Sequence, residues 1–235
     1  MNKNVEVVSL AYKSVAYLDF IASQLQSKYC AAPGWDVGVR IVLNDPTPQV
    51  LQRSKELNIP TTVYNDANPD AWYLERVYRC YNFSVQSSQY DNLCLINSDM
   101  MFSSGWLASL LKHHDGTKIP CSRLVESGKM LSGTYGIGRD FGKDVSALDQ
   151  DGFDEYAASI SEDAVYPGGL YMPCVFEKET FIASGMYPNG NVHVNGKLIT
   201  GDRHLFDILG QNHGLQHITP FDSIVYHIQE GEKDA

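Results

Sequence analysis

The chain has 235 residues, of which 43% are hydrophobic and 20% charged, the composition of a globular protein long enough for one α/β domain. Its net charge of −10 at pH 7 argues against a nucleic-acid partner, which needs a basic surface. The negative charge does not exclude a phosphate ligand, because a bound metal ion neutralises nearby carboxylates. No apolar run approaches the roughly 20 residues of a membrane-spanning helix, so no transmembrane segment is expected.

The five cysteines are scattered along the chain and form no CxxC pair, which argues against a zinc knuckle and a thioredoxin-like motif. The first residues, Met1 to Val5, lack the apolar region of a secretory signal. Together these two features predict a cytoplasmic protein in a reducing compartment.

The first half of the chain alternates between strand and helix patterns. We predict strands at 5–10, 37–43, 61–64 and 93–96, with helices between them at 15–29, 48–57 and 70–87. The second helix has a clear start signal, in which Thr47 is the N-cap and Pro48 the first helical residue. The order βαβαβαβ predicts an α/β fold with a parallel, doubly wound sheet and right-handed crossovers.

The second half gives a weaker pattern, since residues 113–167 show little periodicity and are rich in Gly, Asp and Ser. Beyond them we predict a strand at 170–176, a helix at 177–184, turns at 189–191 and 195–196 around a short hairpin or mobile loop, a helix at 201–209, a strand at 223–227 and a polar tail at 229–235. We expect all of these elements to form a single domain, 1–235.

The strand at 93–96 ends in Asn-Ser-Asp, and an apolar triplet and a helical pattern follow. In open α/β sheets, ligands bind just beyond the carboxyl ends of the strands. Asp99 is therefore predicted to face a crevice in which a divalent cation and a phosphate meet its carboxylate. The alternative is that Asp99 only caps the following helix.

Five features, in this order, resemble the family-2-type glycosyltransferases of GT-A fold: an N-terminal α/β half, an x-x-Asp after the fourth strand, a Gly-Gly strand, an Asp that opens a late helix, and a His that ends the last strand. The resemblance runs from Val5 to His227, with the middle unaligned. It implies a mostly parallel nucleotide-binding half at 5–112 and a mixed acceptor half at 113–228. It also implies a UDP- or GDP-sugar donor, a hydroxyl acceptor that we expect to be a saccharide, and Mn2+ or Mg2+ as cofactor.

The resemblance places five residues at the nucleotide. Ala11 and Tyr12, after the first strand, match positions that flank the nucleobase, and Asp45 matches an acidic residue that accepts a hydrogen bond from the base or ribose. Arg79, with Asn82, is similar to an Arg-Asn pair of the family, although here two residues separate them. The alternatives are an ordinary strand end for the first pair, a turn for Asp45 and a solvated arginine for Arg79.

Asn97-Ser98-Asp99 takes the place of the family's Asp-x-Asp motif. The resemblance makes Asp99 the direct metal ligand, whereas Asn97 can hydrogen-bond the ribose or a water but adds no charge. His227 matches a histidine that completes the metal or diphosphate shell, and imidazole suits manganese better than magnesium. The alternative for His227 is a plain surface residue.

Two glycine motifs complete the resemblance. Gly168-Gly169 is similar to a strand whose glycine lets the backbone approach the sugar, with a packing glycine as the alternative. Gly201-Asp202 falls where the family has Glu-Asp. In inverting members that Asp is the general base, which takes the proton from the acceptor hydroxyl. A simple helix N-cap is the alternative role for Asp202.

Two other functions stay open. A retaining transferase on the same fold would use a different geometry, with His227 and Lys233 near the diphosphate. A non-catalytic protein that binds a nucleotide-sugar or carbohydrate would explain why Asn97 and Gly201 replace acidic residues of the family.

A zinc-protease helix is a poor match to the sequence. His213 and His217 have the i, i+4 spacing, but the glutamate that would act as base is absent and Gly214 weakens the helix.

Overall fold

The computed structural model of the protein describes residues 2–26, 28–130 and 133–230. The elements up to residue 112 are β1 (Asn4–Ala11), α1 (Val15–Gln24), β2 (Asp36–Asn44), α2 (Pro48–Ser54), β3 (Thr61–Tyr64), α3 (Tyr73–Ser87), β4 (Asn92–Ile96), β5 (Met100–Phe102) and α4 (Trp106–Lys112). The later elements are β6 (Lys118–Pro120), β7 (Arg123–Glu126), β8 (Ile137–Gly138), α5 (Gln150–Ile160), β9 (Val165–Pro167), β10 (Cys174–Glu177), α6 (Lys178–Ala183), β11 (Val192–Val194), β12 (Lys197–Ile199), α7 (Gly201–His213), β13 (Gln216–Pro220) and β14 (Ile224–His227).

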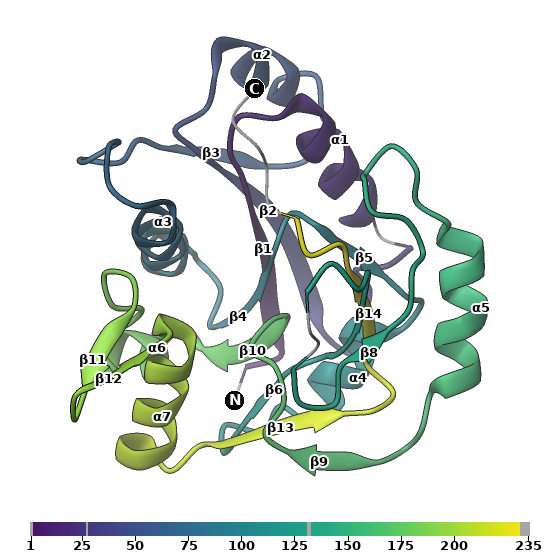
Figure 1. Cartoon of the computed structure of the whole chain (residues 1–235), viewed down its shortest axis with the longest axis vertical. Helices are drawn as coiled ribbons and strands as arrows, with labels where there is room; N and C mark the ends of the chain where they lie inside the picture. Colours follow the sequence, from purple (N-terminus) through teal and green to yellow (C-terminus); the bar gives the residue numbers. More distant parts are fainter. Residues whose placement is uncertain (1, 27, 131–132, 231–235) are drawn as a thin grey trace.

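The main sheet has the strand order β10-β4-β1-β2-β3, and only β10 is antiparallel to its neighbour. The chain runs from β1 through β2 to β3 and then returns through α3 to β4, on the other side of β1. Right-handed crossovers in opposite directions place their helices on opposite faces. Figure 1 accordingly shows α3 on the left and α1 with α2 at the top. The predicted parallel, doubly wound sheet is confirmed, and its crevice lies between the carboxyl ends of β1 and β4.

Local signals at the helix starts have the predicted effect. The Thr47 side chain accepts a hydrogen bond from the Val50 backbone N–H at 3.3 Å, which confirms the N-cap with Pro48 in the first turn. Ser14 caps α1 in the same way through the Tyr17 N–H. Both bonds satisfy a backbone donor that the helix itself leaves without a partner.

Helix boundaries differ from the predictions by three to five residues. Helix α1 ends at Gln24, α2 ends at Ser54 and α3 begins at Tyr73. The apolar residues that extended the predicted first helix, Leu25 and Tyr29, are buried nonetheless, because the loop after α1 folds back onto the core. Burial therefore continues where the helix has ended.

The region 113–167 contains more structure than its sequence indicates. It holds the short strands β6, β7, β8 and β9 and the helix α5, which buries only Phe153 and Ala157. Strand β13 was not predicted either. Strands of two to five residues are too short to show a period, and their pairing comes from distant segments: β7 and β8 join β5 and β14, and β6 and β9 flank β13.

Three predicted elements after residue 167 also need adjustment. The strand predicted from 170 begins only at Cys174, directly after Pro173, which has no N–H to donate to a ladder. Helix α7 continues to His213, and Gly214, whose backbone is left-handed, is its C-cap. His217 lies in β13, so the two histidines do not share a helix, and the zinc-protease pattern is excluded. The predicted hairpin is confirmed as β11 and β12.

The two predicted halves share the main sheet, because β10 from the second half pairs with β4. The predicted polar tail is described only as far as residue 230. All five cysteines are free and buried. Within the described ranges, no helix has the length and apolar character needed to cross a membrane.

A buried ion pair fixes α3 on the sheet. Glu6 on β1 and Arg40 on β2 are each 7% exposed, and Arg40 Nη2 lies 2.8 Å from Glu6 Oε2. The same nitrogen donates to the Ser84 carbonyl of α3 at 2.7 Å, and Arg40 Nη1 donates to Ser87 Oγ. The strands and the helix are thus joined by charge-assisted hydrogen bonds, which are stronger than neutral ones.

Candidate functional site

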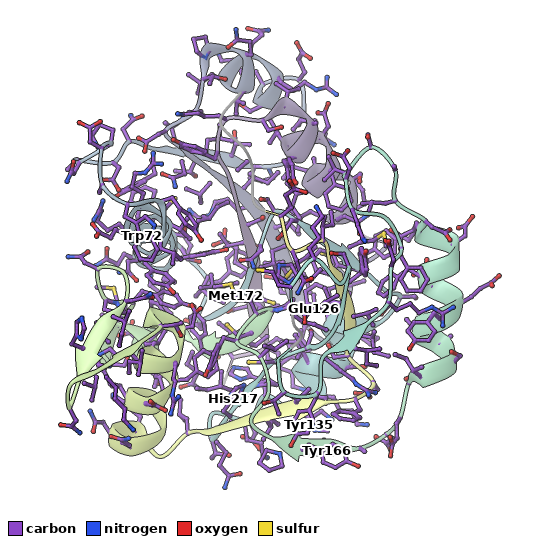
Figure 2. The ribbon with its side chains drawn as sticks, viewed as in Figure 1. Trp72, Glu126, Tyr135, Tyr166, Met172 and His217 are labelled. Atoms are coloured by element: carbon purple, nitrogen blue, oxygen red, sulfur yellow. The ribbon has the colours of Figure 1, made fainter. Side chains whose placement is uncertain are left out.

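A pocket of about 710 Å3 opens at the carboxyl ends of the parallel strands. Leu10, Asn44 and Asn97 line it from the ends of β1, β2 and β4. Figure 2 shows two further lining residues, Glu126 and Met172, near the middle of the molecule. The pocket thus occupies the position at which doubly wound sheets bind ligands.

Six of the predicted site residues line this pocket: Tyr12, Asn97, Ser98, Asp99, Asp202 and His227. The other four lie outside the lining: Ala11, Asp45, Arg79 and Gly169. The pocket is also lined by four residues that the sequence did not single out for this role: Asn44, Arg76, Tyr78 and Glu126. The fold therefore places most of the predicted side chains in one pocket, together with side chains that were not predicted.

Asp99 and His227 form one wall of the pocket. Oδ2 of Asp99 lies 3.2 Å from Nε2 of His227, and Nδ1 of the same ring lies 3.2 Å from Oε1 of Glu126. Glu126 ends β7, whose register with the parallel β14 places it directly beside His227. Asp99 and Glu126 are each only 5% exposed. Three ionisable side chains from separate segments of the chain therefore lie close together, largely shielded from solvent.

The two carboxylates determine the charge of the imidazole between them. Burial by itself lowers the pKa of His227, but Asp99 and Glu126 outweigh that effect and raise the pKa to about 10. The ring therefore carries a proton at neutral pH and links the two carboxylates. It is not the plain surface histidine of the alternative interpretation.

Asp99 and His227 are suited to hold one hard divalent cation. Neighbouring ligands at about 2.1 Å from an octahedral ion stand about 3 Å apart, close to the observed 3.2 Å between Oδ2 and Nε2. Among the residues that the structure describes, no group of three or more His, Cys, Asp or Glu side chains is arranged to hold a metal ion. Two protein ligands suit a cation that takes its other ligands from phosphate oxygens and water, as Mg2+ usually does.

A tyrosine of α3 hydrogen-bonds the Asn97 side chain. The Tyr81 hydroxyl lies 3.1 Å from Asn97 Oδ1 and 2.8 Å from the Ile96 carbonyl. Burial raises the pKa of Tyr81, so the phenol stays neutral and remains a donor. Asn97 is thus held in a fixed orientation, and both Asn97 and Ser98 line the pocket next to Asp99.

Tyr12 and Arg76 also line the pocket and contact each other. Arg76 Nη1 donates to the Tyr12 hydroxyl at 2.6 Å, and the guanidinium lies 4.8 Å from the centre of the same ring. Asn44, at the end of β2, is 3% exposed, and its Oδ1 has no hydrogen-bond partner among the described residues. A buried amide oxygen without a partner is costly unless a ligand supplies the donor.

Asp45 and Arg79 support the loop after β3. Oδ1 of Asp45 accepts a hydrogen bond from the Asp66 backbone N–H at 2.8 Å, and Oδ2 lies 3.7 Å from Nη1 of Arg76. The Asp66 carboxylate accepts two hydrogen bonds from Arg79, each of 2.9 Å. Arg79 is thus committed to a paired carboxylate, and Arg76, one turn earlier on α3, is the arginine in the pocket.

Asp202 lies in the first turn of α7, on the side of the pocket formed by the second half. The N-cap is Thr200, whose side chain accepts from the Arg203 N–H, so the alternative role of Asp202 as N-cap is wrong. Burial raises the pKa of Asp202 to about 6, while a hydrogen bond from the Tyr78 hydroxyl acts in the opposite direction. A carboxylate with a pKa near 6 is suited to proton transfer close to neutral pH.

Two glycines next to the pocket are required by close packing. A Cβ at Gly201 would lie 2.4 Å from Cε2 of Tyr78 and 2.7 Å from the Gly190 carbonyl oxygen, so an acidic side chain has no room there. A Cβ at Gly169, where φ is +124°, would lie 2.0 Å from Oγ1 of Thr219. Gly169 therefore fits its packing alternative, and it leads into Leu170, Tyr171 and Met172, which do line the pocket.

Comparison with solved structures identifies the fold. Over 98% of its length the chain is similar to GalNAc-T7 in a crystal structure with UDP, GalNAc and Mn2+, with 14% identity, a TM-score of 0.59 and coverage of 45% of that chain. It is similar over 98% of its length to the mannosyltransferase PcManGT from Pyrobaculum calidifontis in complex with GDP-Man and Mn2+ (13% identity, TM-score 0.56, 58% of that chain). Over 97% of its length it is similar to residues 1–349 of S. aureus TarS (12% identity, TM-score 0.55, 60% of that chain). The chain has the GT-A fold.

The GT-A similarity extends over part of each neighbour, since this chain spans about half of GalNAc-T7 and about three fifths of the other two chains. No family model matches the chain, and no curated protein matches it in sequence. Identities of 12% to 14% show a shared fold and leave the activity to be inferred from the pocket.

Proposed function

We propose that this protein is a metal-dependent glycosyltransferase that moves a sugar from a nucleotide-diphosphate-sugar to a hydroxyl acceptor, with inversion at the anomeric carbon. The observation that carries the proposal is the 3.2 Å pair of Asp99 and His227 in a pocket that Asp202 also lines. The names of two neighbours agree with it, because they describe complexes of UDP or a GDP-sugar with Mn2+.

The nucleoside would bind at the end of the pocket formed by Tyr12, Asn44 and Arg76. Asn44 Oδ1 and Arg76 Nε are a buried acceptor and a buried donor without partners among the described residues, and a UDP- or GDP-sugar offers hydrogen-bonding edges to both. Asp45 and Arg79 would then act indirectly, since their contacts with Asp66 fix the loop beside Arg76. Ala11 is buried and positions the backbone before Tyr12.

Asp99 and His227 would hold Mn2+ or Mg2+. The ion, when bound, neutralises the charge that develops on the departing diphosphate. Metal binding would displace the proton from Nε2 of His227, because a histidine ligand must be neutral at the nitrogen that binds. The second ring nitrogen of such a ligand usually donates to a carboxylate that fixes the tautomer. Glu126 lies at the right distance from Nδ1 to accept that hydrogen bond, which leaves Nε2 facing Asp99.

Asp202 would act as the general base. The oxygen of the acceptor hydroxyl attacks the anomeric carbon from the face opposite the diphosphate, and the bond from that carbon to the diphosphate oxygen breaks. The hydroxyl proton passes to the Asp202 carboxylate. A pKa of about 6 keeps most of this carboxyl ionised at pH 7 and still leaves it basic enough to accept a proton.

The acceptor would enter between α3 and the segment before β10. Tyr171 lines the pocket there, and its ring is fixed by edge contact with Phe206 and by stacking on His217. Tyr73, at the start of α3, also lines the pocket and is 58% exposed. Rigid aromatic faces suit the apolar faces of a saccharide, which is the acceptor class that we propose.

The test is incubation with UDP- and GDP-sugars and saccharide acceptors, with and without Mn2+, followed by NMR of the product. We expect metal-dependent release of the nucleoside diphosphate and an inverted anomer. A retained anomer would favour the retaining alternative, for which the residue Lys233 lies outside the described part of the chain. Donor binding without turnover would favour the non-catalytic alternative, although Gly201 no longer supports it, because packing accounts for that glycine.

A further inference from the structure

Tyr78 lies in the middle of α3, where its ring is held on one side by a second aromatic residue. It is 2% exposed and lines the pocket. Its ring is stacked on that of Tyr187, with centroids 4.7 Å apart and planes within 3°. A buried side chain in such a stack has little rotational freedom, so the direction of its hydroxyl is fixed.

The stacking partner is itself anchored to α3. One turn after Tyr78, Asn82 Nδ2 donates to the Tyr187 carbonyl at 2.9 Å, and Asn82 Oδ1 accepts from the Tyr187 N–H at 3.0 Å. Both backbone groups of Tyr187 are therefore satisfied by one side chain. This bracing accounts for Asn82, which the resemblance had placed at the nucleotide.

The Tyr78 ring packs against the start of α7, next to Asp202, because residue 201 lacks a side chain. The phenol and the carboxylate both line the pocket, and hydrogen bonding from Tyr78 acts to lower the pKa of Asp202. The Tyr78 ring packs where a Cβ of residue 201 would lie, within 2.4 Å of Cε2. Any larger residue at 201 would displace the ring that carries the hydroxyl.

From this geometry we infer that Tyr78 is the positioning residue of the general base: it orients the Asp202 carboxylate into the pocket and stabilises the ionised form of that carboxylate. Gly201, which has no side chain, leaves the space that the Tyr78 ring needs for this contact. The inference rests on the proposed function for the base role of Asp202. The hydrogen bond and the packing around it do not depend on that role.

The surroundings of Asp202 leave Tyr78 as its principal polar contact. Three other phenols, those of Tyr81, Tyr187 and Tyr171, are close enough to interact electrostatically with the carboxylate. Arg203, the next residue along α7, pairs with Asp207 at 3.6 Å. Burial is the main influence on the pKa of Asp202 and raises it, and the hydrogen bond from Tyr78 opposes that rise.

The first test compares Tyr78→Phe with Tyr29→Phe, each of which removes the hydroxyl of a buried tyrosine. Phenylalanine at 78 retains the stack on Tyr187, and Tyr29 lies outside the pocket lining. Loss of one hydrogen bond to a carboxylate raises its pKa by about half a unit to one unit. We expect the acid limb of the transfer rate against pH to move to higher pH by that amount in Tyr78→Phe alone, with unchanged affinity for the donor nucleotide.

A second measurement needs no activity. In protein labelled with 13C at the aspartate carboxyl groups, the Asp202 signal, assigned by its loss in Asp202→Asn, should titrate near pH 6 and move upward in Tyr78→Phe. Gly201→Ala should move it in the same direction, and adding Gly201→Ala to Tyr78→Phe should have little further effect. An Asp202 signal that titrates identically in the wild type and Tyr78→Phe would overturn the inference.

The two readouts separate the inference from the proposed function. A shifted titration with no sugar transfer in the wild type would uphold the contact between Tyr78 and Asp202 and remove the catalytic role of Asp202. Loss of donor affinity in Tyr78→Phe without any shift of the acid limb would make Tyr78 a donor contact, and it would then not be a positioning residue.

Discussion

The Nε2 atom of His227 lies 3.2 Å from Oδ2 of Asp99, although one residue ends the last strand and the other follows β4. The Ile228 N–H donates to the Asp99 carbonyl at 3.0 Å, so the backbones are joined as well as the side chains. Because of this proximity, the pocket offers a metal ion two ligands, the Asp99 carboxylate and the His227 imidazole.

Replacement of Asp99 by Ala should abolish the metal-dependent part of donor binding. Of the two proposed metal ligands, Asp99 is the one that supplies a carboxylate. Calorimetric titration with a nucleoside diphosphate, with and without Mn2+, measures this effect. Asp36→Asn, an exposed carboxylate at the other end of β2, is the control. Equal affinity gains from Mn2+ in Asp99→Ala and the wild type would reject the metal role.

Asp202→Asn should reduce the transfer rate by about 10²- to 10⁴-fold, because the amide cannot accept the acceptor proton. Donor binding should persist, since Asp202 is not one of the proposed donor contacts. Asp207→Asn is a matched control on the same helix, with an exposed side chain that pairs with Arg203. A turnover number close to that of the wild type would take Asp202 out of the mechanism.

The raised pKa of Asp202 also predicts a pH dependence of stability. Its folded-state pKa of about 6 exceeds the ordinary value of 3.8, so between these pH values the folded protein retains a proton that the unfolded chain releases. The contribution of this group to stability is therefore full below pH 4 and is lost as pH rises through 6. The melting temperature of the wild type relative to Asp202→Asn should fall across this window, and a constant difference would contradict the assignment.

The two arginines of α3 should respond differently to truncation. Arg76→Ala should weaken nucleoside diphosphate binding by about tenfold, because it removes a charge-assisted contact in the pocket. Arg79→Ala should mainly lower thermal stability, since it leaves the Asp66 carboxylate without its bidentate partner. Parallel binding and melting measurements test the contrast. A larger loss of affinity in Arg79→Ala would restore Arg79 as the nucleotide contact.

The buried pair of Arg40 and Glu6 should be costly to break. Arg40→Met leaves the Glu6 carboxylate buried without its partner and should destabilise the fold by about 3–5 kcal/mol. Arg53→Ala, which removes an exposed pair with Asp19, should change stability far less, because solvent screens exposed ion pairs. Denaturant unfolding of both variants provides the comparison, and similar losses would show that burial adds nothing to the first pair.

The amino-acid sequence alone was sufficient for the alternation of strands and helices up to residue 112 and for the N-cap at Thr47. These features depend on contacts within a few residues, such as the bond from the Val50 N–H to the Thr47 side chain, and such contacts leave a local pattern. The sequence also indicated Asp99, Asp202 and His227 as site residues through the order of its motifs, and all three line one pocket.

Only the tertiary structure decided which residues accompany them. Glu126 reaches His227 through the register of β7 with β14, and Tyr78 lies beside Asp202 because its ring packs against Gly201 at the start of α7. Arg76 lines the pocket and Arg79 does not, since the loop at Asp66 engages the second arginine. Pairings between distant segments are set by strand register and by burial of whole elements, and neither leaves a periodic signal in the chain.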